Sequence, residues 1–239
     1  SGNPLEMSIK IVGTGSYVPE KILTNADLEK MVDTSDEWIR TRTGIQERHI
    51  SGSDEASSDM ALKAAKRALE MAGVSPEELD IISVATITMD KITPSTASIL
   101  QSRLKASKAA CFDLQAACTG FLYSLEIANA LLTTGPKYRK ALIIGVEKLS
   151  MLTDWQDRNT CVLFGDGAGA VVLEKRKGHH DVGGILASKL CSDGDYAGIL
   201  EVPAGGSRMP TSRETVDKRL HYLRMEGQEV FKAAVNGMS

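Results

Sequence analysis

Short apolar runs alternate with longer amphipathic stretches through most of the chain. The apolar runs are rich in Ile, Val, Leu and Ala and are bounded by turn residues, which predicts buried strands. The runs that we predict to be strands are 9–12, 81–85, 110–114, 141–144, 162–164 and 170–173. Helical periodicity is clear over 58–72, where Gly73 stands at the position of a left-handed stop. Alternating strands and helices predict an α/β fold with a mostly parallel sheet covered on both faces.

Local start signals predict two further helices. Thr24 to Asp27 has the character of a capping box, which predicts a short helix over 28–32. Pro94 is followed by apolar residues at helical spacing, so we expect a helix to start there.

The pattern changes after a charged, turn-rich stretch at 174–181. We place a boundary at 177/178 and expect a fresh strand over 182–187, an irregular stretch over 203–218 and a helix over 229–235. So few elements would leave one face of a sheet uncovered. We therefore interpret 178–239 as the incomplete start of a second α/β unit.

Composition and charge exclude several classes of protein. The chain has 239 residues and a formal net charge of −3, which gives no reason to expect binding to nucleic acid or to an anionic membrane. No apolar run approaches the roughly 20 residues that span a bilayer. Four widely spaced cysteines without a CxxC pair predict reduced thiols in a cytoplasmic protein and no zinc or other metal site.

Cys118 is the strongest candidate for chemistry. A predicted strand turns at small residues just before it, and a helical pattern starts directly after it. A thiol at a helix N-terminus lies near the positive end of the helix dipole and near free N–H donors, and both favour the reactive thiolate. Many free cysteines are inert core residues, however, so the context alone leaves both interpretations open.

Gly13, Thr14 and Gly15 follow a strand, which is where a dinucleotide-binding loop would stand. The third glycine of that motif is missing, and Pro19 occurs where its helix would run. We therefore reject dinucleotide binding.

Six stretches together make the chain resemble a known family, the 3-oxoacyl-acyl-carrier-protein synthases III. These enzymes are the initiating condensing enzymes of fatty-acid synthesis, in the thiolase superfamily. The stretches are GTGSY (13–17), TNADLE (24–29), TSDEWI (34–39), TRTGI (41–45), AACTGF (116–121) and FGDGAGA (164–170). The resemblance implies two similar α/β halves with central mixed sheets covered by helices, here 7–177 and an incomplete 178–239.

The resemblance also implies an activity. Such enzymes load an acyl group from acyl-CoA onto a cysteine, here Cys118, and condense it with malonyl-acyl-carrier protein, releasing CO2 and CoA. No cofactor takes part. The family's catalytic histidine and asparagine belong to motifs that we expect beyond Ser239, since none of the four histidines matches. Two alternatives stay open: a related enzyme that primes a polyketide or alkylquinolone pathway, and a non-catalytic N-terminal fragment.

Further site residues rest on the resemblance alone. Without the resemblance, a lone tryptophan is explained equally well as a core residue, and an arginine equally well as a solvent-exposed surface residue. The implied coenzyme A contacts are Thr34, Trp38, Arg42 and Arg158, and the implied acyl-pocket residues are Thr93, Leu149, Phe164, Leu200 and Leu223. Thr93 stands where many relatives carry an aromatic residue that reaches the acyl pocket of the partner subunit, so we expect extra space there. A two-fold homodimer is expected to pair through the strand at 110–114.

Overall fold

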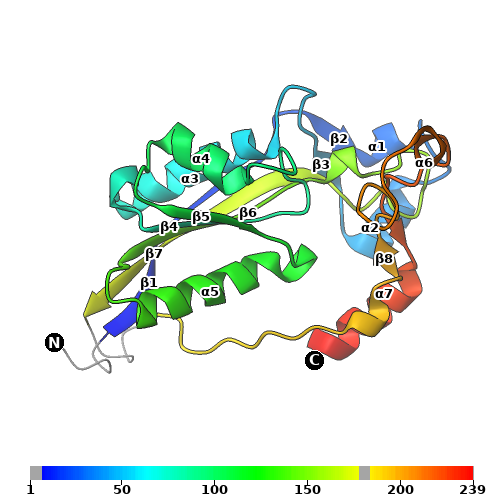
Figure 1. Ribbon diagram of the computed structural model, residues 1–239. Coiled ribbons are helices and arrows are strands. Elements are labelled where there is room, and N and C mark those ends of the chain that lie inside the picture. The colour runs from blue at the N-terminus through cyan, green and yellow to red at the C-terminus, as the bar shows by residue number, and fades with distance from the viewer. Residues whose placement is uncertain (1–6, 178–183, 239) are drawn as a thin grey trace. The chain divides into compact units, whose positions relative to one another are not determined.

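The computed structural model describes residues 7–177 and 184–238 (Figure 1). Within this part of the chain the main sheet has five strands in the order β1-β7-β6-β4-β5. The strands are β1 (Met7–Tyr17), β4 (Ile81–Ala85), β5 (Ala110–Leu114), β6 (Lys140–Lys148) and β7 (Asp166–Lys177). Strand β4 runs parallel to β5 and β6, whereas β1 is antiparallel to β7. The sheet is therefore mixed, as the resemblance implies, and the predicted α/β class is confirmed.

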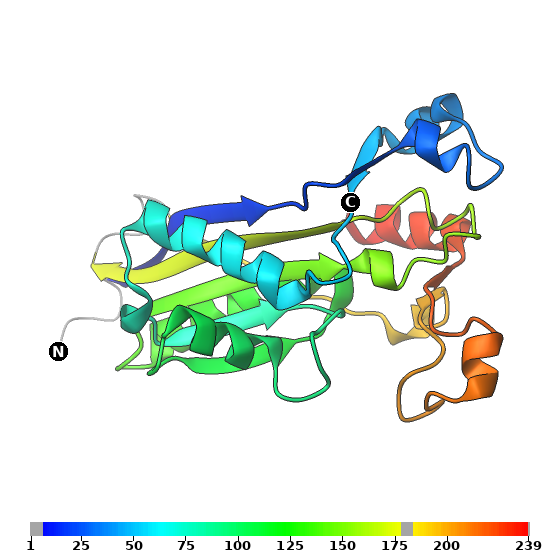
Figure 2. The same cartoon turned by 90° about the horizontal axis from the view of Figure 1, so that it is seen from above.

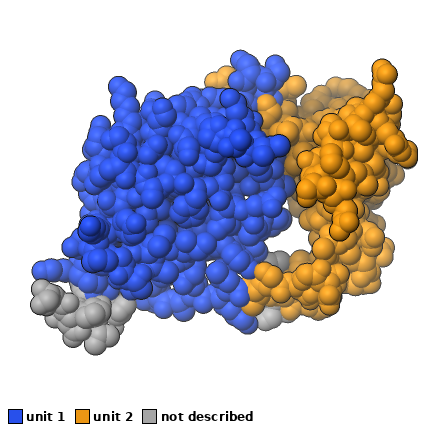
Figure 3. Space-filling model, in the orientation of Figure 1, with its two compact units in different colours: residues 1–19, 51–147, 167–190 blue, residues 20–50, 148–166, 191–239 orange. Residues whose placement is uncertain are grey.

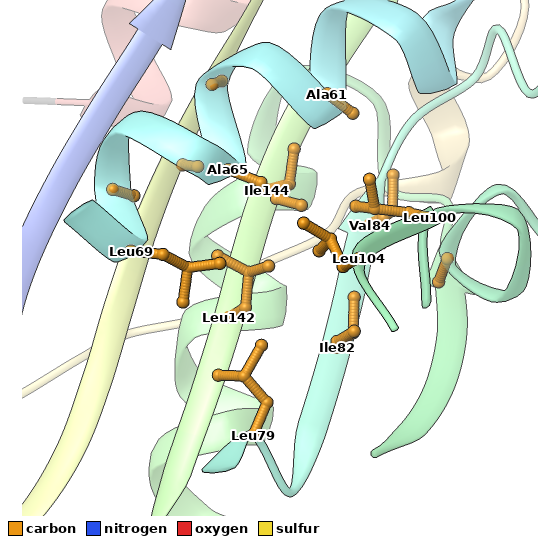
Figure 4. Close-up of a cluster of buried hydrophobic side chains, with 14 of the residues drawn as sticks. Ala61, Ala65, Leu69, Leu79, Ile82, Val84, Leu100, Leu104, Leu142 and Ile144 are labelled. Atoms are coloured by element: carbon orange, nitrogen blue, oxygen red, sulfur yellow. The ribbon is translucent and has the colours of Figure 1, made fainter. Parts of the chain in front are cut away.

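Helices cover both faces of this sheet (Figures 1 and 2). Helices α3 (Ser57–Ala72) and α4 (Thr96–Leu104) lie on one face, and α5 (Gly120–Thr134) lies on the other. Successive residues of β4 point to opposite faces, so Ile82 packs towards α3 and α4 (Figure 4), whereas Ile81 packs towards α5. Both side chains are inaccessible to solvent, and full burial stabilises the fold by about 1.5–3 kcal/mol for each.

One polar contact lies between the sheet and α5. Ser83 in the middle of β4 donates a hydrogen bond to Ser124 of α5, with 3.0 Å between their hydroxyl oxygens. Neither residue is exposed. Buried hydroxyl groups are tolerated when they are hydrogen-bonded, as these two are. Because the bond forms only when the two serines lie opposite each other, it favours one position of α5 along β4.

Glycines let β1 approach α3 closely. A Cβ atom on Gly13 would lie 2.2 Å from the carbonyl oxygen of Ala68, and one on Gly15 would lie 2.2 Å from that of Ala64. The helix presents alanines to the sheet, since Ala61, Ala64, Ala65 and Ala68 are all fully buried. The Gly-Thr-Gly segment is therefore a site of close backbone packing inside a long strand.

The described chain divides into two compact units (Figure 3). Unit 1 contains residues 1–19, 51–147 and 167–190, and unit 2 contains 20–50, 148–166 and 191–239. The main sheet with α3, α4 and α5 belongs to unit 1, which also has the short 3₁₀ turns η2 (Pro76–Glu78) and η3 (Ala117–Thr119). This division rests on contacts and does not test the boundary at 177/178, which stays a prediction.

Unit 2 consists of short elements around a small core of Leu28, Ile39, Cys161 and Val162. Strand β2 (Ile22–Thr24) pairs with β3 (Glu47–His49), and β8 (Leu200–Glu201) pairs with β9 (Arg224–Met225). Its helices and 3₁₀ turns are α1 (Asn25–Leu28), α2 (Asp36–Thr43), η4 (Leu149–Met151), η6 (Gly194–Tyr196), α6 (Arg213–Asp217) and α7 (Gly227–Met238).

Most predicted elements are confirmed. The strands at 9–12, 81–85, 110–114, 141–144 and 170–173 lie in β1, β4, β5, β6 and β7, and the helices at 58–72 and 229–235 lie in α3 and α7. Gly73 is left-handed with φ +63°, and Thr24 and Asp27 form the predicted capping box.

Five predicted boundaries or elements are wrong. The stretch 203–218, predicted to be irregular, contains α6, because Ser212 caps that helix by accepting from the amide of Thr215. The apolar run 162–164 forms turns, because it packs into the small core of unit 2 and the amide of Leu163 donates to Thr160. The helix predicted over 28–32 is α1, which ends at Leu28. Helix α4 begins at Thr96 with Ser95 as its N-cap, two residues after Pro94. Of the strand predicted over 182–187, residues 182–183 lie outside the described residues and 184–187 form no strand.

Candidate active site

Cys118 lies on the turn between β5 and α5, in the 3₁₀ turn η3. The preceding Ala117 has φ +44°, a left-handed conformation that costs an alanine about 1–2 kcal/mol. Residue 118 is exposed, and α5 begins two residues later at Gly120. A Cβ on Gly120 would lie 3.2 Å from the Cβ of Ala85, so the helix starts close against β4. The strained turn thus presents the thiol to solvent at the positive end of a helix.

Two of the other cysteines are poor nucleophiles. Burial, followed by the nearby charge of Asp113, raises the pKa of the half-buried Cys111 to about 11. Burial, followed by the charge of Asp157, also raises the pKa of Cys161, which has no exposed surface. Cys191 is exposed, but it has no helix start beside it: the nearest helical turn, η6, begins at Gly194.

In unit 2, the guanidinium groups of two arginines lie close to the ring of one tryptophan. The guanidinium carbon of Arg42 lies 5.3 Å from the centre of the Trp38 ring, and that of Arg158 lies 5.1 Å from it. Trp38 and Arg42 are one turn apart on α2, whereas Arg158 comes from the turns at 154–163. Asp33, which is fully exposed, lies 3.5 Å from Arg158. We call Trp38, Arg42 and Arg158 the tryptophan clamp.

Thr34 lies two residues before α2 and directly precedes Ser35, the N-cap of that helix. Its hydroxyl oxygen is buried, and no hydrogen-bond partner for it occurs among the described residues. A buried hydroxyl without a partner is unusual and calls for an explanation such as a ligand.

The residues implied for the acyl pocket are spread over both units. Leu149 begins η4, and the amide of the buried Leu223 donates to Leu152, just after that turn, over 2.8 Å. Leu200 lies in β8 and the half-buried Phe164 directly precedes Gly165. These residues, like the clamp and Thr34, belong to unit 2. Thr93 is exposed in unit 1, in the segment between β4 and α4, and Cys118 also belongs to unit 1.

Sequence reasoning missed a half-buried carboxyl group near the end of β6. Glu147 accepts hydrogen bonds from the amide of Ile87 over 2.9 Å and from the hydroxyl of Thr88 over 2.6 Å. Burial raises its pKa above the ordinary value. Glu147 therefore holds the segment that follows β4. The only signal in the sequence is an acidic residue at the end of an apolar run, which is too common to be specific.

Two findings concern other kinds of site. Within the described residues, no three His, Cys, Asp or Glu side chains gather in a group that could hold a metal ion. None of the helices in that part of the chain is both long and apolar enough to cross a membrane.

Comparison with known proteins identifies the family. The profile of the family "3-Oxoacyl-[acyl-carrier-protein (ACP)] synthase III" matches residues 112–194, which include Cys118. A beta-ketoacyl-[acyl-carrier-protein] synthase III of Caldanaerobacter subterraneus subsp. tengcongensis is 59% identical over 228 residues, which are 95% of this chain and 68% of that relative.

Solved structures agree with this match. The 3-oxoacyl-[acyl-carrier-protein] synthase III of Aquifex aeolicus superposes with a TM-score of 0.83 at 48% identity, over 94% of this chain and 67% of that one. The priming beta-ketosynthase of the R1128 polyketide pathway superposes with a TM-score of 0.82 at 33% identity, over 99% of this chain and 68% of that one. The chain therefore belongs to the 3-oxoacyl-acyl-carrier-protein synthase III family, the thiolase-fold acyltransferases that act as initiating condensing enzymes of fatty-acid synthesis.

Proposed function

We propose that this enzyme transfers an acyl group from acyl-CoA to Cys118 and then joins it to malonyl-acyl-carrier protein. The tryptophan clamp is the observation that carries this assignment. An indole ring with two guanidinium groups close to it suits a flat, electron-rich base attached to phosphates, and these are the features of the nucleotide end of coenzyme A.

The exposed thiol accounts for the first step. The thiolate of Cys118 attacks the thioester carbonyl carbon, the carbon–sulfur bond to coenzyme A breaks, and coenzyme A leaves as a thiolate that takes up a proton. Negative charge develops on the carbonyl oxygen, and we expect the positive end of α5, which begins two residues after Cys118, to stabilise that charge. In the second step malonyl-carrier protein loses CO2, its enolate carbon attacks the acyl carbon, and Cys118 leaves as the thiolate. No cofactor is needed for either step.

The Trp38→Ala variant tests the coenzyme A site. Stacking of a base on an aromatic ring contributes about 1–3 kcal/mol, so we expect acylation of Cys118 by acetyl-CoA to lose about 5- to 150-fold in kcat/KM. Intact-mass spectrometry of the acylated protein measures this. Acylation by the acetyl thioester of N-acetylcysteamine, which has no nucleotide, serves as the control and is expected to stay unchanged. Equal effects on both thioesters, or no effect on either, would show that Trp38 is a packing residue.

The second candidate function is the priming of a polyketide pathway. The structural similarity to the R1128 priming ketosynthase favours this function. The greater identity to the fatty-acid enzymes makes us prefer fatty-acid initiation. The two are distinguished by comparing malonyl-carrier proteins of the two pathways as acceptors.

We further propose a cytoplasmic homodimer. Strand β5 ends the strand order of the main sheet, so one edge of it has no neighbour within the described residues. Pairing of β5 with the β5 of a second copy about a two-fold axis would cover this edge. Sedimentation measures the assembly, and a monomer at micromolar concentration would contradict it.

Cysteines without a disulfide among the described residues are consistent with the reducing cytoplasm.

A further inference from the structure

Arg48 is buried, and no acidic partner for it occurs among the residues that the structure describes. It lies in the three-residue strand β3 and is 4% exposed. Its Nε and Nη2 donate to the carbonyl oxygen of Val162 over 3.2 and 2.6 Å, and its Nη1 donates to Oδ1 of Asn25 over 2.6 Å. Within the described part of the chain no carboxylate pairs with this guanidinium. Burying a charge on neutral acceptors is costly, so the arrangement calls for a purpose.

The first acceptor belongs to the segment that carries Arg158. Residues 157–163 form successive turns, in which the amides of Thr160 and Cys161 donate to Asp157. Cys161 and Val162 are 0% and 1% exposed. Because Arg48 donates twice to the carbonyl of Val162, it fixes the end of these turns from inside the unit.

The second acceptor belongs to a residue that holds both ends of α2. Asn25 is 2% exposed, and its Nδ2 donates to Oδ1 of Asp36 over 2.7 Å and to the carbonyl of Ile45 over 2.9 Å. Asp36 is the first residue of α2, and Ile45 follows Gly44, the left-handed residue that ends it. Helix α2 carries Trp38 and Arg42.

We propose that Arg48 and Asn25 are positioning residues that set the spacing of the tryptophan clamp and thereby its affinity for the nucleotide end of coenzyme A. Together they join the turns that carry Arg158 to the helix that carries Trp38 and Arg42. Arg48 touches no substrate and acts through the clamp. This inference rests on the proposed function, since it deepens the assignment of that same site.

The test compares two substrates that differ in the nucleotide. Arg48→Met keeps the length of the side chain and removes its donors. A displacement of about 1 Å costs up to about 10²-fold in a positioned site, so we expect KM for acetyl-CoA in the acylation of Cys118 to rise about tenfold. We expect kcat to change little, and acylation by acetyl-N-acetylcysteamine to stay unchanged. Titration calorimetry with coenzyme A should show the same loss of affinity without any reaction.

Arg40→Met is the matched control. Arg40 lies on α2 with its side chain 53% exposed and its Nη1 3.7 Å from Oδ2 of Asp36. This variant therefore removes one positive charge and one exposed ion pair, but none of the hydrogen bonds of Arg48 or Asn25. We expect it to leave both substrates unaffected. If it weakens coenzyme A binding as much as Arg48→Met does, the effect is one of net charge and the proposal is wrong.

A second set of variants keeps the test valid if Arg48→Met does not fold. Asn25→Asp keeps the acceptor for Arg48 but replaces the donor to Asp36 by a second carboxylate, so we expect KM for acetyl-CoA to rise. Combining it with Asp36→Asn restores a donor–acceptor pair with its direction reversed, and we expect this double variant to recover part of the loss. Asp36→Asn alone keeps an acceptor for Asn25 and should be nearly neutral.

Measuring Trp38→Ala beside these variants distinguishes a failure of the positioning role of Arg48 and Asn25 from a failure of the coenzyme A site itself. If Trp38→Ala discriminates between the two thioesters and neither Arg48→Met nor Asn25→Asp does, the positioning role is wrong and the coenzyme A site stands. If Trp38→Ala does not discriminate either, the proposed site itself is wrong.

Discussion

The Gly15→Ala substitution adds a single methyl group where β1 meets α3. The new Cβ would lie 2.2 Å from the carbonyl oxygen of Ala64 and 2.5 Å from the amide nitrogen of Ala68. Ordinary C···O contacts are about 3.3 Å or longer, so strand and helix must separate by about 1 Å. Both clashing atoms belong to the backbone, and no smaller side chain on α3 can relieve them. Overpacking of a core costs about 1–3 kcal/mol even where side chains can move, so we expect a loss of at least about 3 kcal/mol here.

Urea unfolding followed by circular dichroism measures this loss. With a slope of about 1–3 kcal/mol per molar urea, the midpoint should fall by at least about 1 M, and Gly13→Ala should behave in the same way. Gly169→Ala is the matched control, because that glycine also lies in a strand and a Cβ there would meet nothing within 4 Å. It should leave the midpoint unchanged or raise it slightly, since alanine restricts the unfolded chain. Equal midpoints for the Gly15 and Gly169 variants would refute the close contact as the reason for this glycine.

Three further predictions follow from single side chains. Limited treatment with iodoacetamide should modify Cys118 before Cys111 and Cys161, whose thiols are buried and have raised pKa values; peptide mapping that shows equal rates would contradict this. Burial raises the pKa of Glu147, so its contribution to stability is complete below its ordinary pKa of 4.5 and is lost as pH rises through the raised value. The Glu147→Gln variant should not lose stability in this way. The difference in unfolding free energy between variant and wild type, measured with urea, should therefore change in favour of the variant as pH rises. A difference that stays constant with pH would contradict the assignment. Thr93→Phe should prevent acylation by longer acyl-CoA substrates and spare acetyl-CoA; a wild type that accepts acetyl-CoA alone would overturn the idea that Thr93 leaves space.

The sequence predicts the main sheet well because its central strand is buried on both faces. All five residues of 81–85 are inaccessible or nearly so, and this produces a run with clear ends that is apolar except for Ser83. The run 162–164 is also apolar, but it forms turns. Three consecutive apolar residues can pack into a small local core as well as into a sheet. Periodicity cannot separate these two cases.

The candidate site divides in a similar way. The strand–turn–helix setting of Cys118 is local, so the pattern of residues reveals it. Arg42 lies one turn after Trp38, but Arg158 was linked to them only through the resemblance to the family. The bond from Arg48 to Val162 joins residues 114 positions apart, and that from Ile87 to Glu147 joins residues 60 apart. A single sequence contains no signal for such pairs, and the roles of the site residues stay predictions until the variants are measured.

The hydroxyl pair between Ser83 and Ser124 has a consequence for the reactivity of the thiol. A helix that slips by one residue along its axis moves by 1.5 Å, and α5 begins just after Cys118. A slip of that size is comparable to the misplacement that costs a reacting group about 10²-fold in rate. The position of the sulfur relative to the ends of β4 and β5 therefore depends on a bond between two buried serines, one of which, Ser124, lies six residues after Cys118. Relatives that carry the same residues around the cysteine but a different pair at these two positions would be expected to differ in how fast they accept an acyl group.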